Sequence, residues 1–264
     1  MEPTVGIDVR NVSHAYGARN GRGVVALQGI NLSIRPNEFH ALLGPSGCGK
    51  STLLYLIGGF VPVQTGTIAT ARGRVSAPSP ERGIVFQNFA LFPWKTVREN
   101  VLYGLEKLKL DREERERRAR EFIELVHLTG FEDAYPSQLS GGMQQRTAIA
   151  RTLAVDPEVL LMDEPFGALD AQTRRVMQEE LRAIWQRKQK TVVFVTHDVH
   201  EAVFLAERIS IMSARPGRIE HVIDVGFDRN AGEEVMKTRE FVELSEHIWD
   251  LVRQQAIAAT RGAL

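Results

Sequence analysis

The chain has 264 residues, of which 33 are basic and 33 are acidic, so its formal net charge is zero. A protein that grips nucleic acid by its phosphate backbone usually carries a basic excess, so we expect no nucleic-acid partner. Any polyanion must instead be bound by a few groups gathered at one place in the chain. The single cysteine, Cys48, excludes an internal disulfide framework.

The first part of the chain predicts strands and one helix. Apolar and polar residues alternate over residues 5–9, and more loosely over 27–34, which favours two strands. Residues 17–23 between them have the composition of a flexible loop. The apolar run 39–43 ends in a glycine-rich loop, and a helical pattern follows from Lys50 to about Gly58.

Residues 51–71 contain no Asp, Glu, Lys or Arg, which is a property of membrane spans. Their apolar cluster ends near Val63, whereas a span needs about 20 predominantly apolar residues. We interpret the stretch as a buried helix followed by a turn. The N-terminus lacks the basic-then-apolar pattern of a signal peptide. The sequence thus predicts a cytosolic or peripheral protein that forms no membrane pathway by itself.

Residues 83–87 form a short apolar run that predicts a buried strand, and residues 111–129 predict a helix. Ala119, Phe122, Ile123 and Val126 recur at helical spacing along that helix. Its arginines could form a nucleic-acid patch, but each of three has a glutamate four residues earlier. The predicted pairs are Glu113–Arg117, Glu114–Arg118 and Glu116–Arg120. This pairing favours a solvated helix face.

The second half of the chain predicts an α/β core. Residues 159–162 and 192–195 are continuous apolar runs, which suit strands buried on both faces of a sheet. A helical pattern at 174–188 separates them, giving the order strand, helix, strand. Residues 209–212 and 219–222 resemble closing strands. Apolar residues at helical spacing from Phe241 to Leu251 then predict a docked amphipathic helix.

The loop from Gly44 to Ser51 matches the pattern of a phosphate-binding P-loop. Glycines let successive backbone N–H groups converge on phosphate oxygens, and the following helix adds its positive end. Lys50 is expected to reach the outer phosphates and Ser51 to bind Mg²⁺, while Cys48 is expected to fill space. The predicted nucleotide-binding residues here are Gly44, Pro45, Ser46, Gly47, Cys48, Gly49, Lys50, Ser51 and Thr52.

The apolar run 159–162 ends in two carboxylates, which is the form of a Walker B motif. Asp163 can hold Mg²⁺ through water, and Glu164 can act as the general base that polarises the attacking water. A helix N-cap is the alternative interpretation of such a pair. The presence of a P-loop in the same chain favours the catalytic interpretation.

The segment Leu139–Arg146 predicts a second anion site. Ser140 is a candidate N-cap, and Gly141 and Gly142 leave the start of a helix bare for a phosphate. A chain with one phosphate loop does not need a second for the same nucleotide. We therefore expect two subunits, each lending this helix to the other's ATP.

With these three motifs, the chain resembles the ATP-binding subunit of an ABC transporter over about residues 5–225. The resemblance implies an α/β ABC-type P-loop nucleotide-binding domain with a RecA-like core, an antiparallel β subdomain and a helical subdomain. It implies an ATPase domain over residues 1–228, with the helical subdomain inserted at about 88–155. Residues 229–264 would form a short helical tail without a regulatory domain.

The resemblance also assigns roles to further residues. Tyr16 resembles the aromatic that stacks on adenine, with Val25 packing beside the base; ordinary surface exposure is the alternative for Tyr16. Gln87 resembles the Q-loop glutamine and His197 the switch histidine, although either alone could be a plain polar residue at a strand end. Asp170 resembles the D-loop aspartate, which implies a further nucleotide contact. The implied catalytic residues are Glu164, His197, Lys50 and Gln87, the Mg²⁺ ligands Ser51, Gln87 and Asp163, and the nucleotide contacts from a second subunit Ser140, Gly141, Gly142 and Gln144.

The resemblance implies a head-to-tail homodimer that closes on ATP and Mg²⁺ and hydrolyses ATP only when closed. Two integral membrane permease subunits would dock near Gln87–Trp94, at the cytoplasmic face of the inner membrane. An extracytoplasmic solute-binding protein would take part indirectly. The three aromatic residues within 89–94 could form this docking groove or could belong to the core.

Four segments resemble the nitrate, sulfonate and taurine importer group, namely residues 59–62, 81–88, 91–94 and 163–170. Residues 58–66 are most similar to taurine transporters, which implies uptake of a small anion or sulfonate. The alternative is a soluble ABC ATPase of DNA repair, translation or cluster assembly. A non-hydrolysing regulatory subunit is a third possibility, which the intact Glu164 and His197 disfavour.

Overall fold

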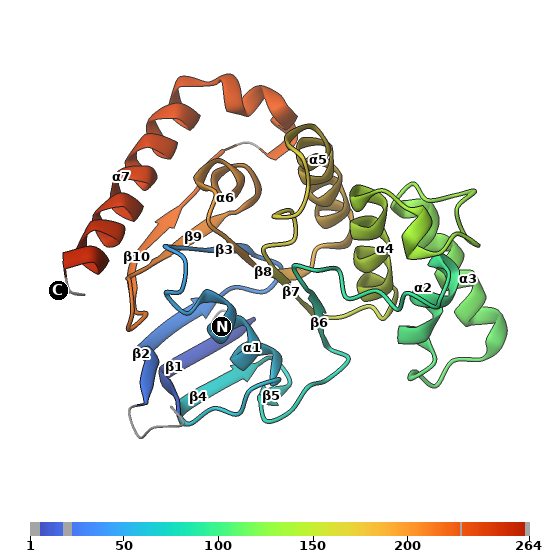
Figure 1. The fold of residues 1–264 in the computed structure, drawn as a ribbon, viewed down its shortest axis with the longest axis horizontal. Coiled ribbons are helices and arrows are strands. Elements are labelled where there is room, and N and C mark those ends of the chain that lie inside the picture. The colour runs from blue at the N-terminus through green and yellow to red at the C-terminus, as the bar shows by residue number, and fades with distance from the viewer. Residues whose placement is uncertain (1–5, 18–22, 228, 262–264) are drawn as a thin grey trace, which may run out of the picture. The chain divides into compact units, whose positions relative to one another are not determined.

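The computed structural model describes residues 6–17, 23–227 and 229–261 (Figure 1). The chain forms two compact units, which we treat separately. Unit 1 comprises Met1–Ser79 and Gln189–Leu264, and unit 2 comprises Pro80–Lys188. Residue 5, at the start of the first predicted strand, and residues 18–22 of the predicted loop lie outside the described residues.

Unit 1 contains two groups of strands and four helical segments. In order along the chain they are β1 (Ile7–Tyr16), β2 (Val24–Ile34), β3 (Phe39–Leu43), α1 (Lys50–Gly58), β4 (Thr65–Thr70), β5 (Gly73–Arg74), β8 (Thr191–Thr196), α6 (Val199–Leu205), β9 (Arg208–Met212), β10 (Ile219–Asp224), η2 (Arg229–Lys237) and α7 (Arg239–Arg261). Strands β2, β1, β4 and β5 form an antiparallel sheet in that order. Strand β3 pairs in parallel with β8 and β9, and β10 pairs antiparallel with β9.

The strands of unit 1 follow from their apolar patterns. Strand β1 alternates at its start, where Ile7 and Val9 are buried and Arg10 is exposed, as a sheet with one solvated face requires. A register shift between Val9 and Val12 then changes the phase, and Val12 is buried as well. Strands β3 and β8 are buried at every position, which fits parallel strands covered on both faces. The C-terminal helix α7 packs on α6 and β9.

Strand β4 is the element that the sequence analysis missed when it interpreted residues 51–71 as a helix and a turn. Only Ile68 of this strand is buried, and the strand is otherwise polar and contains Gly66. Its conformation comes from pairing with β1, in which Ile68 lies opposite Val9. Hydrogen bonding to a strand distant in the sequence therefore makes residues 65–70 a strand, although their local pattern does not predict one.

A buried polar chain joins β3 to β9. The His40 ring bonds the Glu38 carboxylate through Nδ1 at 2.7 Å and the Ser210 hydroxyl through Nε2 at 2.8 Å. All three side chains are at least 97% buried, and Arg208 lies 3.3 Å from the Glu38 carboxylate. A neutral His40 satisfies the set by donating from Nδ1 to Glu38 and accepting at Nε2 from Ser210.

The pKa shifts agree with this arrangement. Burial lowers the pKa of His40, although the neighbouring Glu38 opposes the shift. Burial raises the pKa of Glu38, but the bonds from His40 and from the Arg35 N–H, together with the charge of Arg208, bring it below its ordinary value. Protonation of either group is therefore easier in the unfolded chain than in the native one, and acid favours unfolding.

We expect the free energy of unfolding to fall as the pH drops below about 6.5, where an unfolded histidine gains a proton that native His40 resists. Each such group contributes at most about 1.4 kcal/mol per pH unit. His14, whose pKa is also lowered by burial, contributes with the same sign. The free energy of unfolding is measured by urea denaturation at several pH values between about 7 and 5. Its dependence on pH should be weaker for His40→Gln than for the wild type. The change His247→Gln, at an exposed position, should keep the wild-type slope; an unchanged slope in His40→Gln would contradict this account.

Unit 2 contains a parallel strand pair and five helical segments. They are β6 (Arg82–Val85), α2 (Val97–Leu105), α3 (Arg112–Leu125), η1 (Pro136–Gln138), α4 (Gly141–Ala154), β7 (Val159–Asp163) and α5 (Ala171–Lys188). Strand β6 pairs in parallel with β7, and helices α2 and α3 both pack on α4. These contacts bury Val101, Leu105 and Ile123.

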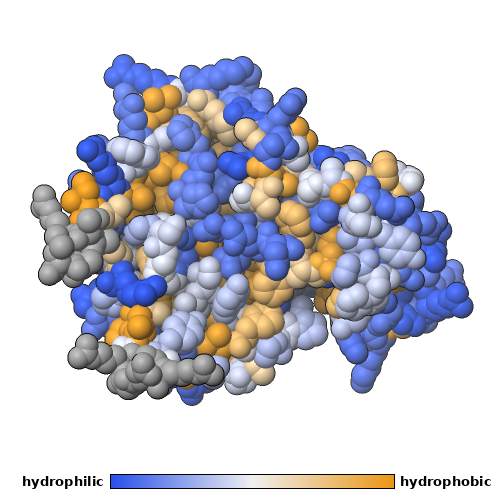
Figure 2. Space-filling model, in the orientation of Figure 1, coloured by the Kyte–Doolittle hydropathy of each residue, from blue (hydrophilic) through white to orange (hydrophobic). Residues whose placement is uncertain are grey.

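Helix α3 confirms the predicted solvated helix but is shorter than predicted. It starts after Asp111, whose carboxylate accepts the Glu114 N–H at 2.8 Å. It ends at Leu125 because the backbone turns left-handed at His127, with φ 55°. Figure 2 shows a predominantly hydrophilic surface over this helix.

The ion pairs of α3 differ in part from the predicted set. Arg118 bonds Glu114 at 2.8 Å as predicted. Arg117 bonds the same carboxylate at 2.7 Å, three residues away rather than four. Arg120 donates to a backbone carbonyl instead of a side chain. Both spacings bring side chains together on one helix face, and local rotamers decide between them.

In the described part of the chain, every helix is too short or too polar to cross a bilayer.

Candidate functional site

The loop between β3 and α1 has a backbone that only glycine adopts readily. Gly47 and Gly49 have φ values of 76° and 106°. A Cβ on Gly49 would also lie 2.7 Å from Leu27 Cδ2 and 3.0 Å from the Ala26 carbonyl oxygen. Gly49 caps α1 without a side-chain bond, and the first turn of α1 carries no acidic residue. The N–H groups at this helix start therefore suit a phosphate.

Lys50 supplies the positive charge of this loop. Its ammonium donates to the Gly44 carbonyl at 2.8 Å and to the Pro45 carbonyl at 3.2 Å, and its side chain is buried. These bonds hold the cation inside the loop. A chain with no net charge thus concentrates a cation and several amides at one point, as predicted.

Cys48 has the environment of a packing residue. Its side chain is only 1% exposed, and burial raises the pKa of its thiol although the charge of Lys50 opposes the shift. A protonated, enclosed thiol is a poor nucleophile. The structure agrees with the predicted space-filling role.

Tyr16 lies beside the phosphate loop. Its hydroxyl is 3.3 Å from Thr52 Oγ1 on α1, and its ring makes a T-shaped contact with the His14 ring, with the two ring centres 4.7 Å apart. Tyr16 and Val25 are each nearly half exposed, at 46% and 45%. They lie on neighbouring strands, with Val25 opposite Ala15. An exposed aromatic face next to the loop fits the predicted adenine contact, which stays a prediction.

A second loop, residues 213–218, packs on the P-loop and was not foreseen from the sequence. The Arg215 guanidinium donates to the Gly47 carbonyl at 3.1 and 3.3 Å. The Gly217 N–H donates to the Ala26 carbonyl at 2.9 Å. A Cβ on Gly217 would collide with the carbonyl oxygen of Cys48. The Arg-Pro-Gly turn after β9 was the available signal, but its contact with residues 26–48 is visible only in three dimensions.

His197 follows β8 directly and is exposed. The turn that carries it is held on both sides. The Asp198 N–H donates to Thr196 Oγ1 at 3.0 Å, and Asp198 caps α6 through the Glu201 N–H at 3.1 Å. Thr196 also bonds the Glu201 carboxylate. The predicted switch histidine is therefore presented on a fixed strand-to-helix turn.

In unit 2, the turn after β7 carries the predicted acidic pair. Asp163 is 5% exposed, and Glu164 has a left-handed backbone with φ 43°. The Gly167 N–H donates to the Glu164 carbonyl at 3.1 Å, and a Cβ on Gly167 would lie 3.5 Å from Gln87 Nε2. The structure thus brings Gln87 next to the acidic turn. Strained residues cluster at functional sites, which supports the catalytic interpretation.

The predicted second anion site lies at the start of α4. Ser140 caps this helix by accepting the Met143 N–H at 3.3 Å. Cβ atoms on Gly141 and Gly142 would lie 3.4 Å from Leu169 and 2.7 Å from Thr173. The two glycines therefore let the segment around Asp170 pack closely on the start of α4.

Two predicted nucleotide contacts have structural bonds within unit 2. The Gln144 amide donates to the carbonyls of Pro136 and Leu139, at 3.0 and 3.2 Å. Asp170 caps α5 by accepting the N–H groups of Gln172 and Thr173, and these bonds lower the pKa of its carboxyl. Both residues hold turns beside the predicted site, and their nucleotide contacts stay predictions.

The predicted Mg²⁺ ligands agree with the ion by donor chemistry. Ser51, Gln87 and Asp163 offer hydroxyl, amide and carboxylate oxygens, which Mg²⁺ prefers. Among the described residues no cluster of three His, Cys, Asp or Glu could hold a metal.

The comparisons with known proteins decide the family. A family model described as ABC transporter matches residues 27–167. The chain belongs to the ABC transporter family of ATP-binding proteins. An uncharacterized ABC transporter ATP-binding protein of Methanocaldococcus jannaschii is 48% identical to it over 242 residues, which cover 92% of this chain and 90% of the relative.

Two further relatives have names that mention a solute. A nitrate import ATP-binding protein of Synechocystis is 44% identical and covers 97% of this chain and 98% of its own length. A taurine import ATP-binding protein of Rhizobium johnstonii is 45% identical, with 92% and 94% covered. A solved ATP-binding cassette, dimeric and bound to ADP and Pi after hydrolysis, is similar with a TM-score of 0.73 and 35% identity over 84% of this chain and 100% of its own. The resemblance to ABC ATP-binding subunits and the α/β fold class are thereby confirmed.

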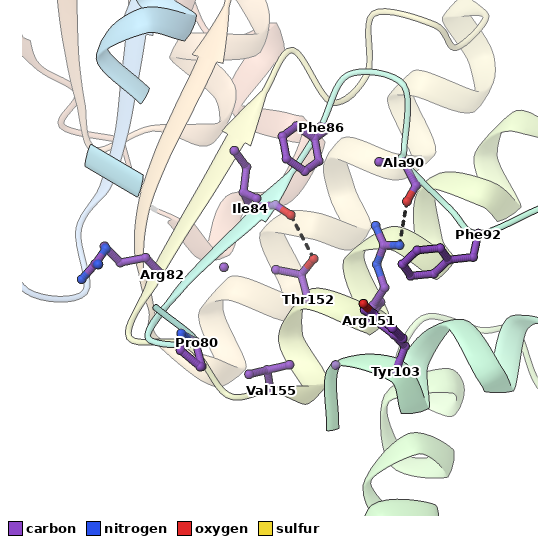
Figure 3. Close-up of a pocket in the computed structure, with 12 residues that line it drawn as sticks. Pro80, Arg82, Ile84, Phe86, Ala90, Phe92, Tyr103, Arg151, Thr152 and Val155 are labelled. Atoms are coloured by element: carbon purple, nitrogen blue, oxygen red, sulfur yellow. Dashed lines mark hydrogen bonds between the residues drawn. The ribbon is translucent and has the colours of Figure 1, made fainter. Parts of the chain in front are cut away.

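Unit 2 of this ABC protein also contains an apolar cavity of about 470 Å³ (Figure 3). Phe86 and Ala90 line it from the segment after β6, Phe92 and Tyr103 add aromatic rings, and Arg151 enters from α4. The Phe92 and Tyr103 rings are 4.4 Å apart. The aromatic residues of 89–94 differ in burial, and their role as a docking groove stays a prediction. Phe89 is buried in the core, whereas Trp94 is 70% exposed.

The change Gly217→Ala tests whether the second loop supports the P-loop. The added methyl must displace Cys48 and with it the amides that suit a phosphate. Loss of one charge-assisted hydrogen bond corresponds to about tenfold weaker ATP binding. Titration with a fluorescent ATP analogue measures the affinity, and thermal unfolding checks the fold.

The matched control is Gly226→Ala, where an added Cβ would have no neighbour within 4 Å. It should bind ATP like the wild type. Equal affinity in both variants would show that the P-loop does not depend on the loop at residues 213–218.

Proposed function

We propose that the chain is the ATP-hydrolysing subunit of an ABC importer for a small anion or sulfonate, such as taurine, an alkanesulfonate or nitrate. The main support for ATP hydrolysis is the turn after β7. This turn contains buried Asp163 and left-handed Glu164 and lies next to Gln87. The import direction and the solute class are supported by the names of the nitrate and taurine relatives. The test of the solute is ligand binding by the cognate extracytoplasmic binding protein.

The proposed mechanism divides the work between two copies of the chain. Gly44–Thr52 of one copy binds the phosphates of ATP, and Ser140–Gly142 of the other closes on the γ-phosphate. Ser51, Gln87 and Asp163 would hold Mg²⁺, which neutralises charge on the phosphates. Glu164 orients the attacking water, while Lys50 and His197 stabilise charge on the transferred phosphoryl group. Hydrolysis is thereby gated by closure of a head-to-tail dimer, and support comes from the dimeric solved cassette.

The change Glu164→Gln should abolish turnover and preserve ATP binding, because the amide keeps the shape but cannot act as a base. We expect phosphate release to fall by at least about a hundredfold. The ATP-bound variant should accumulate as a dimer in light scattering after size exclusion. Glu158→Gln, the same change at an exposed position before β7, is the control. Near-normal turnover in Glu164→Gln would remove Glu164 from this role.

The change Ser140→Arg should prevent dimer formation and leave ATP binding by the single subunit intact. A long cationic side chain at the start of α4 would obstruct the place where the second copy's γ-phosphate is proposed to lie. Ser140→Ala is the comparison variant: it removes the hydroxyl, and with it the helix cap at a cost of about 1 kcal/mol, but adds neither bulk nor charge, so it should weaken dimerisation less than Ser140→Arg. Unchanged dimerisation in Ser140→Arg, measured by light scattering with ATP, would contradict the shared site.

We further propose that two permease subunits dock near Gln87–Trp94. Support comes from the exposed Trp94 ring and from the apolar cavity lined by Phe92 and Tyr103. Short amphipathic helices bind such grooves by inserting apolar side chains. The chain would then work at the cytoplasmic face of the inner membrane.

The proposed domain organisation keeps the boundaries given by the resemblance. Residues 1–228 form the ATPase domain, with the helical subdomain at about 88–155 and the tail at 229–264. Support comes from helices α2, α3 and α4, which lie within 88–155, and from η2 and α7, which make up the described tail. The longest helix of unit 2, α5, has 18 residues, which argues against the long coiled-coil insertion of repair ATPases.

A further inference from the structure

The segment that follows Gln87 has a strained backbone. Phe89 and Ala90 both lie in the left-handed region, with φ values of 60° and 46°. Neither is glycine, and two such residues in succession are unfavourable for L-amino acids. A conformation of this kind persists only where neighbouring groups hold it.

One side chain bonds the carbonyl groups of both strained residues. The Arg151 guanidinium donates to the Ala90 carbonyl at 2.7 Å and to the Phe89 carbonyl at 3.0 Å (Figure 3). The planar fork of arginine matches two adjacent acceptors, which a lysine ammonium does not reproduce. The left-handed turn and the guanidinium therefore fit each other.

Other contacts fix the guanidinium. It lies 5.7 Å from the centre of the Phe92 ring, which in turn packs on Tyr103. Burial lowers the pKa of Arg151, but arginine keeps its charge in proteins. Its hydrogen bonds to the two carbonyls, at 2.7 and 3.0 Å, are the contacts that tie it to the strained turn.

Through Arg151, helix α4 is bonded to the strained turn at Phe89–Ala90. Helix α4 begins at Ser140, eleven residues earlier, which corresponds to about 16 Å along the helix. The same helix thus carries the proposed γ-phosphate contact at one end and holds the segment after Gln87 at the other. Gln87 itself lies against Gly167, next to the acidic turn.

We propose that Arg151 is a positioning residue that holds the turn at Phe89–Ala90, and through it Gln87, to the helix that begins at Ser140. This inference rests on the proposed function for its consequence in catalysis, but its structural part is independent of it. Arg151 touches no predicted nucleotide contact and acts through the backbone that follows Gln87. Arg151 also lines the cavity proposed to receive the permease. A permease segment bound in the cavity would therefore change the position of Gln87 through Arg151 and the turn at Phe89–Ala90.

Hydrogen exchange of the full chain tests the structural part without any need for hydrolysis. In Arg151→Lys, amides in a peptide spanning residues 86–92 should exchange at least about tenfold faster than in the wild type. Arg118→Lys, the same change on α3, should leave that peptide unchanged. Phe92→Leu removes only the ring under the guanidinium and should accelerate the same amides by about threefold, which keeps the test valid if Arg151→Lys does not fold. Unchanged exchange in Phe92→Leu and in folded Arg151→Lys would overturn the proposal.

Steady-state kinetics test the consequence for Gln87. Arg151→Lys should lower kcat for ATP by about tenfold and leave KM within about twofold, because the side chain does not contact ATP. In a Gln87→Ala background the same change should cause no further loss, since both act through one group. Multiplicative losses would show that Arg151 acts independently of Gln87. A wild-type chain without ATPase activity would refute the proposed function, while the exchange experiment would still decide the role of Arg151.

Discussion

The left-handed backbone at Gly47 and Gly49 is the constraint on which unit 1 depends. An anion site made of amides needs a tight loop, and a tight loop leaves no room for side chains around it. Leu27 and Ala26 pack where a Cβ on Gly49 would lie, and Gly217 packs against the carbonyl of Cys48. Strand β2, which carries Ala26 and Leu27, and the loop that carries Gly217 are therefore held at a distance set by the phosphate loop.

Unit 2 uses strain in the same way, but at residues that are not glycine. Glu164, Phe89 and Ala90 all have positive φ values. Such conformations cost of order 1–3 kcal/mol each, so the surrounding structure must hold them. Gly167 bonds the carbonyl of Glu164, and Arg151 bonds those of Phe89 and Ala90. The strained residues follow the two strands, β6 and β7, that lie side by side in unit 2.

Charge is distributed according to the same need. A neutral chain holds a buried cation at Lys50 and a half-buried one at Arg151, and both donate to backbone carbonyls. Backbone acceptors can stabilise a cation without cancelling its charge, whereas a carboxylate partner would repel phosphate. The buried Glu38–His40–Ser210 chain is different, because its acid, its base and Arg208 compensate one another inside the unit.

Local sequence patterns determined the elements whose signal lies within a few residues. Helix α1 has the predicted bounds, the continuous apolar runs became β7 and β8, and the P-loop glycines have the backbone that their pattern required. These features depend on local sterics and on burial of whole segments. Helix α5 starts earlier than predicted, at Ala171, because Asp170 supplies a cap.

Only the tertiary structure decided the remainder. Strand β4 exists because β1 pairs with it, and the roles of Arg151, Arg215 and Gly217 depend on carbonyls at least 60 residues away in the chain. The sequence by itself determined the family, the phosphate loop and the acidic turn, since each is a short motif with its own physical logic. Non-local contacts decide which side chains hold those motifs in place. Every residue type has a backbone carbonyl, so the type of the accepting residue does not indicate that its carbonyl accepts a hydrogen bond.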